Sequence, residues 1–136
     1  MRPKFCLAFL LAALVFGAGT LGAHHSTTAV FDTAKKITVT GTLTKVDWVN
    51  PHIVILVEGK VNGGGSPETW RLESNPPSWF RRVSVGRSDF AKGLGQTVTV
   101  EANPAKDGTM YGYMVKITFA DKTSLELVLP GQEDSK

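Results

Sequence analysis

Apolar and polar side chains alternate along several short stretches of the chain, and this alternation predicts β-strands. Residues 37–48, Ile-Thr-Val-Thr-Gly-Thr-Leu-Thr-Lys-Val-Asp-Trp, carry apolar side chains at most second positions. The same period of two appears in Gln-Thr-Val-Thr-Val-Glu at residues 96–101. Because successive side chains of a strand point to opposite faces of a sheet, the pattern is typical of strands with one buried face.

Four further segments have the composition of short strands. Residues 52–57 are β-branched and apolar, which is typical of a strand with little exposed surface. The other expected strands are residues 69–73, 111–119 and 124–129. The stretch Asn-Gly-Gly-Gly-Ser-Pro at residues 62–67 is expected to be a loop, because glycine has no side chain to pack and proline lacks a backbone donor.

The alternation stops between the third and fourth expected strands. Pro77, followed by Ser78 and an apolar pair, predicts the start of a short helix. Three strands, a helix and two or three more strands follow the order of an OB-type barrel. The sequence therefore predicts a mainly β protein: a small OB-like barrel of five to six strands, with one short helix between strands 3 and 4. The main alternative is an immunoglobulin-like sandwich, which needs about seven strands without a helical interruption.

The start of the chain has the order of a secretory signal peptide. Arg2 and Lys4 precede an apolar run at residues 5–16, and small residues follow as far as Ala23. The run is shorter than the roughly 20 residues of a membrane-spanning helix, so no stable membrane anchor is expected after cleavage. The expected division of the chain is a signal peptide at 1–23, an N-terminal arm at 24–36, the barrel at 37–129 and a flexible tail at 130–136.

Removal of a signal peptide changes the charge of the protein. The whole chain has a net charge of +3 and a pI of about 9.1. Without Arg2 and Lys4, 13 of the 15 basic residues remain against 12 acidic residues, which leaves a net charge of +1. A nucleic-acid-binding protein normally keeps a basic face, so this class is not expected. Cys6 is removed with the signal peptide, which excludes disulfides and thiolate metal sites from the remainder.

The histidines are the candidate metal ligands. The chain contains three, His24, His25 and His52. If cleavage follows Ala23, His24 becomes the first residue, and its α-amine and ring Nδ1 can chelate one metal ion together. Their reference pKa values are about 7.7–8.0 and about 6.5, so a metal displaces their protons readily. Copper heads the affinity series of the divalent ions at such nitrogen ligands.

A second imidazole would complete the arrangement known as a histidine brace, and His52 is the candidate. It follows the Asn-Pro turn at residues 50–51, at the mouth of the expected barrel, where OB-type folds bind ligands. Asp32 and Asp47 are candidate acceptors for ring N–H groups. A simpler interpretation is that His52 hydrogen-bonds the turn that it follows.

The N-terminal histidines also have other interpretations. The His24-His25 pair is also compatible with a cleavage junction that is exposed to solvent and has no partner. Cleavage one residue earlier would leave Ala23-His24-His25, which chelates copper in a different, planar geometry.

The remaining features are weaker. Trp48 and Trp70 are either an aromatic ligand face or part of the core, and core is the commoner outcome. The arginines at 81, 82 and 87 either hold an anion or form a solvated face. No nucleophile elbow, phosphate-binding loop or paired carboxylate motif is visible, so the sequence carries no enzyme signature.

Several motifs together resemble a known family. They are His24-His25-Ser26, Phe31-Asp32, Gly41-Thr42, Trp48-Val-Asn-Pro-His52, Trp70-Arg-Leu-Glu73 and Val98-Thr-Val-Glu-Ala-Asn-Pro-Ala-Lys-Asp-Gly108. The chain resembles the small secreted bacterial proteins of domain-of-unknown-function family 6152, from residue 24 to about residue 127. The resemblance implies a compact β-rich domain exported across the inner membrane of a Gram-negative bacterium, and it supplies no established activity or catalytic residues.

The sequence thus predicts a periplasmic or secreted protein that binds a metal ion. Copper is the favoured ion, and His24, His25 and His52 are the candidate ligands. The alternative is a metal-free periplasmic binding module that recognises a peptide, a glycan or an envelope protein through the barrel face around Trp48 and Trp70.

Overall fold

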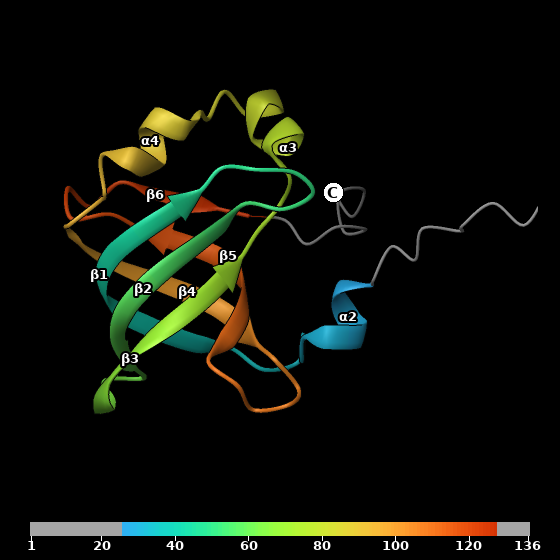
Figure 1. Cartoon of the computed structure of the whole chain (residues 1–136), viewed down its shortest axis with the longest axis vertical. Helices are drawn as coiled ribbons and strands as arrows, with labels where there is room; N and C mark the ends of the chain where they lie inside the picture. The colour runs from blue at the N-terminus through green and yellow to red at the C-terminus, as the bar shows by residue number, and fades with distance from the viewer. Residues whose placement is uncertain (1–25, 128–136) are drawn as a thin grey trace, which may run out of the picture.

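Residues 26–127, which the computed structural model describes, form a closed barrel of five strands with one additional strand (Figure 1). The strands are β1 (Ile37–Asp47), β2 (Val54–Val61), β3 (Gly64–Glu73), β4 (Thr97–Pro104), β5 (Tyr111–Thr118) and β6 (Ser124–Glu126). They are hydrogen-bonded in the order β3-β2-β1-β4-β5-β6, and a parallel pairing of β3 with β5 closes the ring. The prediction of a mainly β, OB-like barrel is confirmed.

Two short helices, α3 (Pro77–Arg82) and α4 (Arg87–Ala91), connect β3 to β4 across one end of the barrel (Figure 1). A single short helix was expected there. The segment divides because Ser84 adopts a positive φ of 60° after α3, and the backbone N–H of Gly86 donates to the Asp89 carboxylate at 2.8 Å. That hydrogen bond satisfies a backbone donor at the start of α4.

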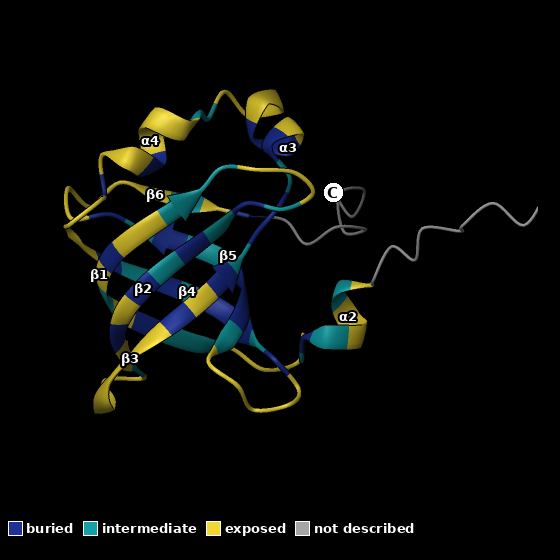
Figure 2. Cartoon of the chain, viewed as in Figure 1, coloured by how far each residue is buried: buried dark blue, intermediate teal, exposed yellow. Residues whose placement is uncertain are grey.

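The core fills the barrel and continues beneath these helices. Buried and exposed residues alternate along the strands, as Figure 2 shows. Phe80 and Phe90 are completely buried and pack on each other with perpendicular rings 5.5 Å apart. Trp48, just after β1, contacts both rings at 5.3 and 5.6 Å. This aromatic cluster closes the barrel end below α3 and α4.

Several strand boundaries differ from those expected. β2 spans Val54–Val61 instead of residues 52–57, and β6 ends at Glu126 instead of residue 129. β3 begins at Gly64, so the prediction of a loop over residues 62–67 is wrong. The turn consists of Asn62 and Gly63 alone, with φ angles of 50° and 73°, and Val61 pairs directly with Gly64. Positive φ at both central residues matches the right-handed twist of a hairpin, so two residues suffice to reverse the chain. β4 also continues beyond residue 101, as far as Pro104.

The N-terminal arm is attached to the outside of the barrel. It contains one helical turn, α2 (Thr27–Val30), and its anchor is Phe31, which is only 3% exposed. Phe31 forms a bridge with Ala105, and the backbone N–H of Asp32 donates to the carbonyl of Pro104 at 2.9 Å. Within residues 26–127, no helix has the length and apolar character needed to cross a membrane.

Candidate functional site

His52 lies in the loop between β1 and β2, and two backbone hydrogen bonds fix the segment that carries it. The N–H of Ile53 donates to the carbonyl of Asn75 at 3.2 Å, and the N–H of Ser74 donates to the carbonyl of Ile53 at 2.8 Å. These bonds extend the pairing of β2 with β3 beyond the strand ends. Because Ile53 is completely buried, the backbone beside His52 has little freedom to move.

The ring of His52 is held by a carboxylate. Its Nδ1 lies 2.9 Å from Oε1 of Glu73 and 3.1 Å from the carbonyl oxygen of Ser74. Both neighbours are acceptors, so Nδ1 carries the proton, and in the neutral ring Nε2 has the free lone pair. The His52 side chain is 33% exposed and that of Glu73 is 17% exposed. A histidine held in this way resembles the metal-ligating histidines of proteins, whose second ring nitrogen donates to a carboxylate.

Glu73 uses its other oxygen to contact two neighbouring side chains. The Tyr111 hydroxyl donates a hydrogen bond to Oε2, and Nη1 of Arg71 lies 3.8 Å from the same atom. The Arg71 guanidinium also stacks on the Tyr111 ring, 4.6 Å from its centroid. Burial and the hydrogen bond to Glu73 raise the pKa of Tyr111, so its hydroxyl stays protonated and continues to donate.

The raised pKa of Tyr111 predicts a loss of stability in alkaline solution. In the unfolded chain this hydroxyl ionises near its reference pKa of about 10. Its contribution is therefore complete below pH 10 and is lost as the pH rises through the higher pKa of the folded state. We expect the free energy of unfolding of the wild type to fall more steeply above pH 10 than that of Tyr111→Phe. Urea unfolding at pH 8 and pH 11 measures this, and equal slopes in the two proteins would contradict it.

A shallow surface pocket of about 290 Å³ surrounds His52. Its lining residues are Asp47, Val49, Asn50, Pro51, His52, Val54, Arg71 and Glu73. The pocket is open to solvent and contains both acidic and basic groups. Its volume leaves room for an ion or a small polar group beside His52.

The two acceptors expected for a histidine N–H do not have that role in the described residues. The Asp32 carboxylate pairs with Lys35 at 3.1 Å, and the Asp47 carboxylate pairs with Lys45 at 3.0 Å, although Asp47 lines the pocket. Glu73 is the acceptor instead. The pairing of β2 with β3 explains this contact, because Val54 is paired with Glu73 and side chains two residues apart share a face.

Of the three candidate ligands, the structure places only His52. His24 and His25 lie outside the described residues, so their assignment as metal ligands stays a prediction. Within residues 26–127, no three side chains of the His, Cys, Asp or Glu type form a group that could hold a metal ion.

The tryptophans are mainly part of the core. Trp70 is 7% exposed and Trp79 is 8% exposed, and Trp48 packs on Phe80 and Phe90. An aromatic ligand face around Trp48 and Trp70 would need these rings at the surface. Trp70 is buried in the described barrel, so its ring does not form part of such a face.

The fold and the site define an OB-like barrel that carries a partly buried histidine–glutamate pair beside a surface pocket. The family of unknown function DUF6152 matches residues 12–114, and the chain belongs to this family. The resemblance seen in the sequence motifs is thereby confirmed. No curated protein and no solved structure matches the chain.

Proposed function

We propose that the protein is exported to the periplasm, or secreted, by a Gram-negative bacterium and binds one metal ion there, with copper favoured. In this proposal His24 contributes its α-amine and ring, His52 contributes Nε2, and His25 either joins the site or supports it. The role is to hold or deliver the ion. The single observation that carries the proposal is the 2.9 Å contact between Nδ1 of His52 and the Glu73 carboxylate.

That contact prepares His52 as a ligand in two ways. It directs the proton to Nδ1 and leaves the Nε2 lone pair available. The negative charge of the carboxylate also favours a cation bound at Nε2. Since the His52 side chain is 33% exposed, an ion can reach Nε2 without opening the core.

His24 and His25, the other candidate ligands, directly precede the anchored arm in the sequence. Ser26 is the first described residue, and His24 is two positions before it. Two extended residues span at most about 7 Å. The α-amine of a chain that begins at His24 would therefore stay close to the anchored arm. Nitrogen ligands of this kind favour Cu(II) over the other divalent first-row ions.

Native mass spectrometry of the exported protein with one equivalent of Cu(II) tests the proposal. We expect a chain that begins at His24 and retains one copper ion. His24→Ala and His52→Ala should each weaken the binding strongly, because each removes nitrogen ligands. Glu73→Gln should weaken it by about 10- to 100-fold, since it removes the charge that supports His52 while it keeps the size of the side chain.

Glu101→Gln is the matched control, because Glu101 is paired with Lys36 rather than with a histidine. It should bind copper as the wild type does. A chain that begins at His24 and holds no copper would overturn the proposal. The protein would then be better described as a metal-free module for a peptide, a glycan or an envelope protein.

A further inference from the structure

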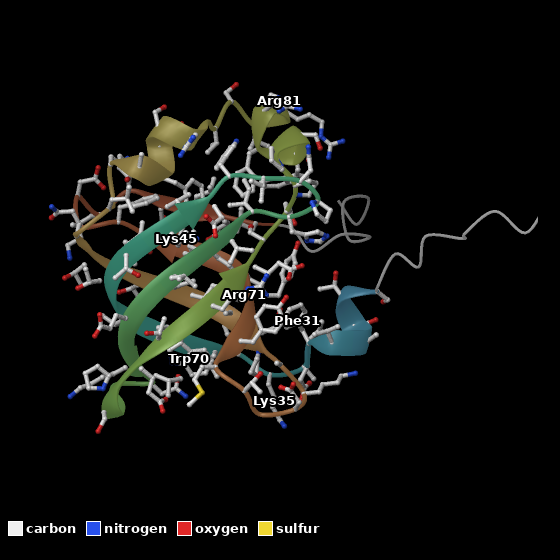
Figure 3. All side chains as sticks on the ribbon, in the orientation of Figure 1. Phe31, Lys35, Lys45, Trp70, Arg71 and Arg81 are labelled. Atoms are coloured by element: carbon white, nitrogen blue, oxygen red, sulfur yellow. The ribbon has the colours of Figure 1, made fainter. Side chains whose placement is uncertain are left out.

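The anchor of the N-terminal arm lies in an aromatic slot formed by β5. Phe31 packs against Tyr111 with ring centroids 4.9 Å apart, and against Tyr113 at 5.5 Å. Figure 3 places Phe31 between the arm and the barrel, on the same side of the molecule as Arg71. This small cluster is separate from the main core of the barrel. Removal of Phe31 from this slot would therefore expose the small cluster and leave the main core covered.

Hydrogen bonds hold the arm on either side of Phe31. The backbone N–H of Lys106 donates to the carbonyl of Val30 at 3.0 Å, and its Nζ donates to the carbonyl of Thr28 at 2.6 Å. On the other side, the N–H of Asp32 donates to Pro104 at 2.9 Å. The backbone amides of Lys106 and Asp32 are therefore protected only while the arm is docked.

Tyr111 is the residue that the arm and the histidine site share. Its ring packs against Phe31, and its hydroxyl donates to Oε2 of Glu73. The Oε1 atom of the same carboxylate lies 2.9 Å from Nδ1 of His52. A single chain of contacts thus runs from Phe31 through Tyr111 and Glu73 to His52. It crosses the β3–β5 pairing that closes the barrel, where Arg71 is paired with Tyr111.

We infer that Tyr111 is a positioning residue that couples docking of the arm to metal binding at His52. This inference rests on the proposed function. When Phe31 is docked, the Tyr111 ring is fixed, and its hydroxyl holds the Glu73 carboxylate in the position that orients His52. Coupling between two sites is reciprocal, so a metal ion that needs this orientation of His52 also stabilises the docked arm.

Hydrogen–deuterium exchange of the exported protein, with and without one equivalent of Cu(II), tests the coupling. We expect copper to slow exchange at the amides of Asp32 and Lys106 by about fivefold or more in the wild type. Tyr111→Phe keeps the ring against Phe31 and removes the hydrogen bond to Glu73. It should dock its arm normally without copper, lose most of the copper-induced slowing and bind copper about fivefold more weakly.

Tyr113→Phe is the matched control. It also removes one phenol hydroxyl from the slot, but that hydroxyl donates to Asn75 rather than to Glu73. It should keep the full copper-induced slowing. The same slowing in Tyr111→Phe as in the wild type would overturn the coupling and leave the metal site standing. A wild type that binds no copper would overturn the proposed function, and the coupling with it.

Discussion

Replacement of Gly41 by alanine should destabilise the barrel by about 3 kcal/mol or more. Gly41 of β1 is paired with Gly59 of β2, and the two backbones approach closely at this point. A Cβ atom on Gly41 would lie 2.1 Å from the carbonyl oxygen of Glu58 and 2.4 Å from the Cα of Gly59. These are backbone atoms, so no side-chain rotation can relieve the clash. The two strands would have to separate within a closed ring.

Urea unfolding followed by tryptophan fluorescence measures this effect. Gly64→Ala is the matched control. Gly64 begins β3 of the same sheet, and a Cβ atom there meets nothing within 4 Å. Its free energy of unfolding should stay within about 0.5 kcal/mol of the wild type. Equal stability of Gly41→Ala and Gly64→Ala would show that the two strands do not approach as closely as the structure indicates.

Phe80→Ala should cost about 3–5 kcal/mol of folding free energy. Phe80 is completely buried, and its ring contacts three other aromatic side chains. The ring centroids of Trp48, Trp79 and Phe90 lie 5.3, 5.1 and 5.5 Å from its own. Removal of the ring leaves a cavity between α3 and the barrel end, because neighbours packed on several sides cannot all move in to fill it.

Val83→Ala provides the comparison for this prediction. Val83 follows α3 directly and is 46% exposed, so its truncation should change stability by no more than about 0.5 kcal/mol. Thermal unfolding of the three proteins, with Trp fluorescence as the probe, gives the order of stability. A loss below about 1 kcal/mol in Phe80→Ala would mean that the helices can collapse onto the barrel without this ring.

Local patterns were sufficient to predict the strands. In β1 and β4 the period of two survives in the structure because one face of each strand meets the core, and Val39, Leu43, Val98 and Val100 are all buried. The turn at Asn62 and Gly63 was harder to place. Three consecutive glycines carry no periodic signal, so the boundary between turn and strand depends on the pairing of Val61 with Gly64.

The site depended on contacts between distant parts of the chain. Glu73 was not predicted to meet His52, because the register of β2 and β3 shifts between Gly59 and Val61. Residue pairs counted back from the Asn62-Gly63 turn therefore assign the wrong partner to Glu73. The contact of Phe31 with Tyr111 is equally invisible in a local pattern, since it depends on where the arm crosses the closed barrel.

The sequence by itself determined the succession of strands along the chain, the OB-like class of the barrel, the helical segment between β3 and β4 and the family. Periodicity and turn chemistry are properties of neighbouring residues, so one chain is enough to show them. Only the tertiary structure decided that Glu73 supports His52, that Tyr111 joins this pair to the arm and that Gly41 faces Gly59. Those relations follow from barrel closure and strand register, which bring together residues that no local pattern connects.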